Sequence, residues 1–92
     1  MLYLICYDIV KARNRRRLAN VLMDHGTRVQ KSAFECDLAT EARLRVLVAS
    51  ARLCLDPQTD TLRIYRVCAS CREEALALGL NHSRPVLPTV IV

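Results

Sequence analysis

A continuous apolar run at residues 2–10, Leu-Tyr-Leu-Ile-Cys-Tyr-Asp-Ile-Val, limits the folds open to this chain more than any other segment. The run is too apolar for a strand with one solvent-exposed face and too short for a typical helix. We therefore expect a central β-strand that is covered on both faces. Asp8 is the one charged residue in this run, near its carboxyl end. Because burying an unpaired carboxylate is costly, Asp8 must lie at the strand end, meet a cation or hold a proton.

The residues that follow predict a helix and then two strands. Asn14 can cap a helix, and Gly26 can supply a left-handed stop. The apolar face of this helix comprises Leu18, Val21, Leu22 and His25. Residues 27–38 alternate with period two, but Val29 has the opposite parity to Phe34 and the apolar residues after it. We therefore expect two strands joined by a tight bend or bulge at residues 31–33.

The second half of the chain predicts a helix, a strand and a shorter helix. Thr40 can cap a helix that ends before Asp56-Pro57, with a core stripe made by Leu44, Leu47, Val48, Ala51 and Leu55. Residues 61–68 are rich in β-formers and predict a strand. A short helix is expected at 72–78, stopped by Gly79. The tail at 85–92 is apolar to its last residue, and Pro88 favours an edge strand there, added to a neighbouring protomer's sheet.

The order of elements is βαββαβ with an additional C-terminal strand. This order predicts an α+β fold of the ferredoxin-like type, an antiparallel sheet with two helices on one face. The 92 residues allow one domain, 1–92, with a small core. An apolar share of 52% is high for that length, which favours an oligomer. Fold alone does not decide function, since this arrangement serves many activities.

Positive charge is concentrated in the first third of the chain. The formal net charge is +5; residues 1–34 hold seven Lys or Arg against two acidic residues, whereas residues 35–92 hold seven of each. A one-sided basic surface attracts polyanions, chiefly nucleic acid or anionic lipid. Arginines at 13, 15, 16 and 17 begin the first predicted helix, where the helix dipole disfavours positive charge. Phosphate contact would explain this placement, and a solvated helix face is the alternative.

Asp8 beside this basic cluster has the chemistry of a magnesium site that serves phosphate. A carboxylate is a hard oxygen ligand, and substrate oxygens and water can complete the octahedron. One aspartate is a meagre site, but two-fold pairing of central strands could bring Asp8 of each protomer to a shared position. The alternative is that Asp8 caps the following turn or pairs with Arg13 or Arg15.

Five cysteines, an odd number lying mostly in apolar patterns, favour a reducing cytoplasm over a secreted disulfide framework. No apolar stretch reaches the roughly 20 residues that span a bilayer, so we expect no membrane segment. Cys68 and Cys71 have the CxxC spacing of zinc or redox sites. One such pair without a second pair or a nearby histidine is weak, and a structural turn is favoured over zinc.

Several segments together resemble the CRISPR-associated protein two family. They are the strand end Tyr7-Asp8-Ile9, the arginines at 15 and 17, and residues 26–35, Gly-Thr-Arg-Val-Gln-Lys-Ser-Ala-Phe-Glu. The run Arg-Ile-Tyr-Arg-Val-Cys at 63–68 and the apolar end of the chain are also similar to family members. The family comprises small metal-dependent endonucleases that are also the non-catalytic partner of the spacer-acquisition integrase.

The resemblance implies a homodimer, a terminal strand exchanged across it, and a prokaryotic cytoplasmic location. It implies that Asp8 is the magnesium ligand and catalytic residue, facing its symmetry mate across the dimer. Ser32 matches the serine of the family's Gln-x-Ser motif. The other positions that match residues near the nucleic-acid cleft are Tyr7, Arg15, Arg17, Arg28 and Phe34.

Two hypotheses follow from the resemblance. The first is a homodimeric, magnesium-dependent endonuclease of RNA or DNA, in which the metal between two Asp8 residues activates water. The second is a non-catalytic, DNA-binding scaffold subunit of the spacer-integration complex, for which Asp8 is dispensable. A more distant alternative is a metal- or ligand-carrying module that uses Cys68 and Cys71.

Overall fold

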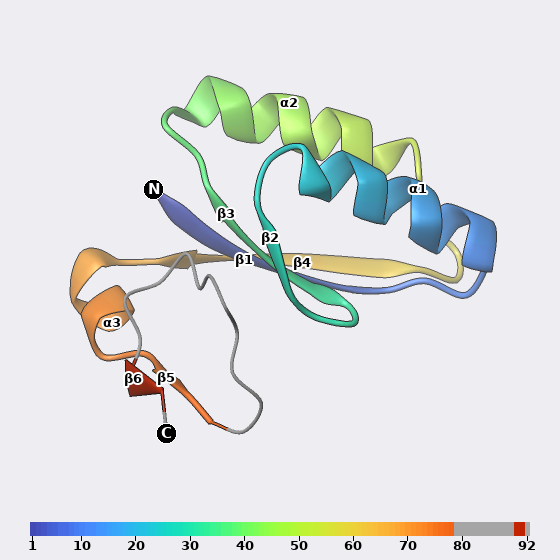
Figure 1. The fold of residues 1–92 in the computed structure, drawn as a ribbon. Coiled ribbons are helices and arrows are strands. Elements are labelled where there is room, and N and C mark those ends of the chain that lie inside the picture. The colour runs from blue at the N-terminus through green and yellow to red at the C-terminus, as the bar shows by residue number, and fades with distance from the viewer. Residues whose placement is uncertain (79–89, 92) are drawn as a thin grey trace.

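The sheet and the helices follow the predicted order (Figure 1). The structure is a computed structural model, and it describes residues 1–78, 90 and 91. The elements are β1 (Leu2–Asp8), α1 (Ala12–Met23), β2 (Thr27–Gln30), β3 (Ala33–Asp37), α2 (Glu41–Arg52), β4 (Thr61–Val67), α3 (Ala69–Glu73), β5 (Leu76–Ala77) and β6 (Val90–Ile91). Four strands form an antiparallel sheet in the order β2-β3-β1-β4. This confirms the α+β, ferredoxin-like fold class.

Strand β1 is central, as its apolar sequence predicts, with β3 on one side and β4 on the other. Its odd-numbered side chains Tyr3, Ile5 and Tyr7 face α1 and α2 and are buried. The even-numbered Leu4 and Cys6 are only partly buried, and Asp8 is exposed. The expectation of a strand covered on both faces holds only in part: both long helices lie on the odd-numbered face (Figure 1), and of the even-numbered side chains only Leu2 is fully covered, with an exposed fraction of 2%.

The core lies between this face and the two helices. Alternation along the strands and helical spacing along α1 and α2 direct the largest apolar groups into one layer. Its fully buried members are Ile5, Leu18, Leu22, Phe34, Cys36 and Leu47. The shared face predicted for Phe34, Cys36 and Leu38 is confirmed, since all three are buried.

Helix α1 begins earlier and ends differently from the prediction. Its cap is Lys11 rather than Asn14, and no side chain caps it. At the other end Gly26 is not in the left-handed region. A Cβ atom at Gly26 would instead clash with the carbonyl oxygen of Glu35 and with Cys36 on β3. Glycine is therefore needed here because the backbone at residue 26 approaches β3 closely, not because this residue adopts a left-handed conformation.

The hairpin and the second helix match their predictions. Residues 31 and 32 form the turn between β2 and β3, and the register shifts between Arg28 and Gln30 as a bulge does. Thr40 caps α2 by accepting a hydrogen bond from the backbone N–H of Arg43 at 3.2 Å. No helix among the described residues is both long and apolar enough to cross a bilayer.

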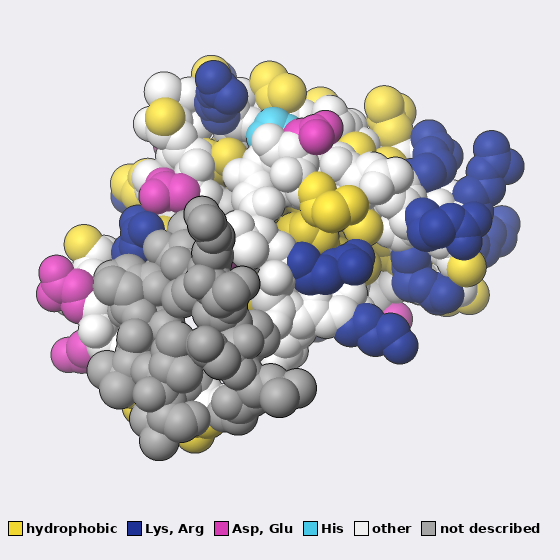
Figure 2. Space-filling view, in the orientation of Figure 1, with side chains coloured by type: hydrophobic (Ala, Val, Ile, Leu, Met, Phe, Trp, Pro, Cys, Tyr) yellow, Lys and Arg dark blue, Asp and Glu magenta, His cyan; other side chains and the backbone are white. Residues whose placement is uncertain are grey.

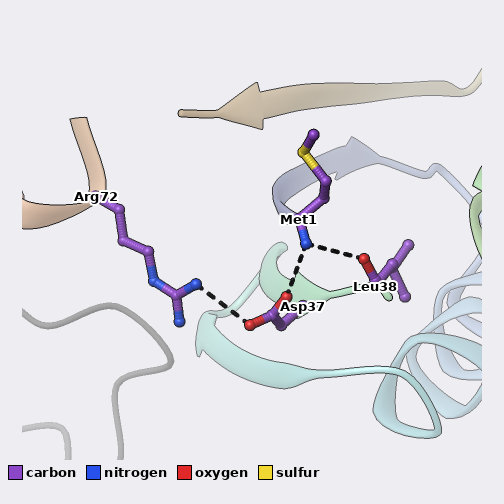
Figure 3. Close-up of polar contacts among 4 residues, drawn as sticks. All are labelled: Met1, Asp37, Leu38 and Arg72. Atoms are coloured by element: carbon purple, nitrogen blue, oxygen red, sulfur yellow. Dashed lines mark hydrogen bonds and ion pairs between the residues drawn. The ribbon is translucent and has the colours of Figure 1, made fainter. Parts of the chain in front are cut away.

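Helix α3 is placed three residues earlier than the prediction of 72–78, because Cys68 caps it. Residues 76 and 77 form β5, which pairs in parallel with residues 90 and 91 of β6. Arg72 of α3 contacts Asp37 at 3.2 Å, and Asp37 also accepts a hydrogen bond from the Met1 amine at 3.1 Å (Figure 3). Residues 79–89 and 92 lie outside the described part, so the exchange of the terminal strand stays a prediction.

Candidate nucleic-acid interface and metal ligand

The carboxyl end of β1 opens into a groove of about 720 Å³ between α1 and the β2–β3 hairpin. One stripe of α1 lines it, at intervals of three and four residues: Ala12, Arg15, Arg16, Ala19, Asn20 and Met23. The hairpin contributes Arg28, Lys31 and Ser32, and β1 contributes Tyr7 and Asp8. We call this the basic groove, because four cations, Arg15, Arg16, Arg28 and Lys31, line it beside one carboxylate.

The side chain of Asp8 is exposed, and its carboxylate has no hydrogen bond or ion pair within the described part of the chain. The turn after it is held by other groups. Asp60 accepts hydrogen bonds from the backbone N–H of Val10 at 3.0 Å and of Asp56 at 2.9 Å. Hydrogen bonding to these two amides, Asp56 first, holds the pKa of Asp60 below its ordinary value. The alternative in which Asp8 caps this turn is therefore wrong.

Arg15 does not pair with Asp8 either. One of its Nη atoms donates to the carbonyl oxygens of Ile9 and Val10, each at 3.0 Å. These two bonds fix the guanidinium against the β1–α1 turn at the edge of the basic groove. Arg15 therefore has a structural task, and its remaining N–H groups can still meet an anion.

Arg28 is supported by two buried rings. Its guanidinium carbon lies 5.3 Å from the centroid of the Phe34 ring, a cation–π contact. The rings of Phe34 and Tyr7 stack with centroids 6.3 Å apart. The exposed fraction of Phe34 is 0% and that of Tyr7 is 6%. Tyr7 lines the basic groove, in line with its predicted place near a nucleic-acid cleft, whereas Phe34 is not among the lining residues. Both rings are buried and support Arg28 and the hairpin, and a direct contact of either ring with nucleic acid stays a prediction.

The hairpin is tied to the end of β1 by two further bonds. The hydroxyl of Tyr7 donates to the carbonyl oxygen of Lys31 at 3.4 Å, and the backbone N–H of Tyr7 donates to Ser32 at 3.1 Å. Ser32 itself is exposed. The bonds bring Lys31 and Ser32 to the same groove as Asp8, although 23 or more residues separate them in the sequence.

Arg17 is not part of the basic groove. It lines a different groove together with Asn20, Val21 and residues of the α2 end. Successive residues of a helix are rotated by about 100°, so Arg15, Arg16 and Arg17 cannot all face one side. The family resemblance selected Arg17 and left out Arg16 and Lys31, which line the groove. The spacing from Ala12 and Ala19 on the α1 stripe was the signal that could have identified Arg16.

Basic side chains dominate this end of the molecule. Figure 2 shows Lys and Arg gathered where α1 begins, over the surface that includes the groove. Within the described residues there is no group of three or more His, Cys, Asp or Glu that could hold a metal ion. In the basic groove, the Asp8 carboxylate is the one hard, accessible oxygen ligand that a side-chain carboxylate supplies. This fits a magnesium ion whose other ligands come from water, phosphate and a second copy of the chain.

Comparisons with known proteins identify the family of this chain. The family model described as CRISPR associated protein Cas2 matches residues 1–75. The chain belongs to the Cas2 family. Among curated relatives, the CRISPR-associated endoribonuclease Cas2 1 of Chloroflexus aurantiacus is 46% identical over 79 residues, covering 86% of this chain and 85% of the relative. The sequence resemblance to this family is thereby confirmed.

Solved Cas2 structures have the same fold. Streptococcus pyogenes Cas2 has a TM-score of 0.78 at 28% identity, covering 86% of this chain and all of that one. A chain of the partial Cas6-RT-Cas1–Cas2 complex has a TM-score of 0.69 at 26% identity, covering 92% of this chain and 89% of that one. The Cas2 fold is therefore found in a complex that contains Cas1.

Proposed function

We propose that this Cas2-family chain is a magnesium-dependent endonuclease whose site is centred on Asp8. The observation that carries the proposal is an exposed carboxylate without a partner in the described chain, beside the cations of the basic groove. A carboxylate so close to phosphate-binding cations would repel the substrate unless a divalent cation bridged the two. The relative from Chloroflexus aurantiacus carries the name endoribonuclease, which supports RNA as one substrate.

Asp8 would hold the ion, and the chain's other residues would bind the strand. When bound, magnesium would lower the pKa of a coordinated water and offset charge on the scissile phosphate. Arg16, Arg28 and Lys31 would contact phosphates on either side of it. Arg15 would keep the β1–α1 turn, and so the backbone of Asp8, in a fixed place through its bonds to Ile9 and Val10.

A homodimer would complete the site. The sheet face opposite the helices carries Asp8 together with the partly buried Leu4 and Cys6 and with Tyr65, whose exposed fraction is 48%. A two-fold axis through this face near the end of β1 would cover these apolar groups and bring two Asp8 carboxylates together. Their mutual repulsion would be relieved by the shared cation. The C-terminal strand would then add to the second copy's sheet.

A second candidate function is a scaffold subunit that grips DNA within the spacer-integration complex. The observation that favours it is the structural likeness to a chain from a complex that contains Cas1. In this function the basic groove binds duplex phosphates, an integrase subunit is the protein partner, and the Asp8 carboxylate has no catalytic task.

Cleavage assays separate the two functions. Purified wild-type protein and Asp8→Ala are incubated with RNA and DNA in magnesium and in excess chelator, and binding is measured in parallel. The endonuclease proposal expects cleavage only by the wild type with magnesium, with binding kept in both proteins. Equal, negligible cleavage by both proteins at several pH values, with binding intact, would leave the scaffold function in its place.

A further inference from the structure

The two exposed cysteines of the chain, Cys68 and Cys71, lie together at the start of α3, far along the chain from Asp8. Cys68 is the capping residue, and its sulfur accepts a hydrogen bond from the backbone N–H of Cys71 at 3.4 Å. The hydroxyl of Ser70 lies 3.3 Å from the same sulfur. Two polar groups within one turn therefore contact a single accessible sulfur atom.

We propose that Cys68 and Cys71 form a thiol–disulfide exchange site that accepts low-molecular-weight disulfides. Cys68 is the attacking sulfur and Cys71 the resolving sulfur. The cap-to-third-residue spacing places the two side chains over the same first turn of α3, where the backbone N–H of Cys71 already points at Cys68. The proposed nuclease function does not use these residues.

The pKa values of the two thiols are shifted in opposite directions, as an attacking and a resolving cysteine require. Hydrogen bonds from the Ser70 side chain and then from the Cys71 backbone lower the pKa of Cys68 to about 7. The pKa of Cys71 is raised, first by its hydrogen bond to the Cys68 side chain. At neutral pH, Cys68 therefore has the larger thiolate fraction of the pair, and Cys71 keeps its proton.

The other three cysteines provide internal controls. Cys36 and Cys54 are buried, and burial raises the pKa of Cys36 to about 11. Cys6 is only partly accessible, on the sheet face opposite the helices. Buried or protonated thiols react slowly with disulfides, so exchange is expected at the α3 pair alone.

The reaction balances without any further reagent. The Cys68 thiolate attacks one sulfur of the disulfide, whose S–S bond breaks and releases the first thiol after protonation. Cys71 then loses its proton to solvent and attacks the Cys68 sulfur of the mixed disulfide, which releases the second thiol. The protein dithiol is oxidised by two electrons, and the small disulfide is reduced to two thiols.

The test uses oxidised glutathione with the full-length reduced protein, followed by alkylation and peptide mass mapping. In the wild type we expect the peptide that contains residues 68–71 to lose two hydrogens and to resist alkylation, while the other cysteines remain free. Cys71→Ser should stop at glutathione bound to Cys68. In Cys68→Ser only Cys71 remains at this site, and we expect it to react with glutathione disulfide at least about five-fold more slowly than Cys68 does in Cys71→Ser. Cys68 has the larger thiolate fraction, and its lower intrinsic nucleophilicity offsets only part of that advantage.

Ser70→Ala is the matched control, because it keeps both sulfurs and removes one hydrogen bond to Cys68. It should slow the first step and leave the final disulfide unchanged. Equal rates for the two cysteine variants, or a wild-type pair that stays reduced under the same conditions, would overturn the proposal. So would an equivalent of bound zinc that is lost in Cys71→Ser, because the pair would then be a metal site.

Discussion

Asp8 and Asp37 are the last residues of two neighbouring antiparallel strands, so they lie at opposite ends of these strands in the same sheet. Asp37 has two cationic partners, the Met1 amine and Arg72 (Figure 3). Asp8 has none within the described chain, although four cations line its groove. A carboxylate with partners stabilises the fold that holds it. One left free among cations at its groove is available to a ligand, and that difference is the basis of the proposed function.

The largest expected effect is on cleavage. Asp8→Asn removes the charged oxygen ligand with almost no change in shape, so we expect the rate of magnesium-dependent cleavage to fall by about 100-fold or more. Asp37→Asn, the matched control at the end of β3, should keep most of the activity. If both variants lose activity equally, the two carboxylates do not differ in the way proposed here.

The next effect is on binding. Arg16→Glu places a negative charge in the basic groove, and we expect about a ten-fold loss of nucleic-acid affinity at moderate salt. Arg17→Glu makes the same charge change one residue later, on a different helix face. Arg17→Glu should therefore reduce nucleic-acid affinity clearly less than Arg16→Glu. Titrations of both variants at several salt concentrations make the comparison, and equal losses would show that only overall charge matters.

A smaller effect is expected on thermal stability when Asp37, at the end of β3, is changed. Asp37→Asn should lower the melting temperature by about 2–4 °C, as expected for a partly exposed ion pair. The hydrogen bond from the Met1 amine, more than that from Arg72, lowers the pKa of Asp37. A lowered pKa in the folded state means that this stabilisation exists above the unfolded pKa and is lost as the pH falls through the folded one.

Melting curves of wild type and Asp37→Asn at neutral pH and in acid measure this contribution. The gap between them should close in acid, once the pH lies below the folded pKa of Asp37. A gap that persists unchanged in acid would mean that the Asp37 carboxylate does not owe its effect to its charge.

The smallest effect is expected for the stability of Asp8→Asn. Because the Asp8 side chain is exposed and unpartnered in the described chain, the free energy of unfolding of the Asp8→Asn variant should stay within about 0.5 kcal/mol of the wild-type value. Denaturant titration measures it. A large loss would mean that Asp8 is a structural residue like Asp60, and that any loss of activity follows from unfolding.

The sequence predicted the parts of the fold that depend on local pattern. The apolar run of β1, the parity change at Val29 and the cap at Thr40 each placed an element within a residue or two. It failed where a distant contact decides. Gly26 is required by β3, and α3 begins early because the Cys68 sulfur, not a hydroxyl or carboxylate, caps it.

The same distinction holds at the candidate site. Asp8 could be chosen from sequence because a lone carboxylate in an apolar run is conspicuous. That Asp60 holds its turn could not be predicted, because 52 residues separate the two and only the pairing of β1 with β4 brings them together. Arg17 was chosen over Arg16 from the resemblance, whereas the helix rotation turns it away from the groove.

Subunit mixing tests most directly whether Asp8 is half of a site that a second copy completes. Wild type and Asp8→Asn are unfolded together in equal amounts, refolded and assayed for magnesium-dependent cleavage. If two Asp8 carboxylates share one site, only wild-type homodimers cut, and activity falls to about one quarter of that of an equal total amount of wild type. Activity of about one half would show that each chain acts alone and would contradict the shared site.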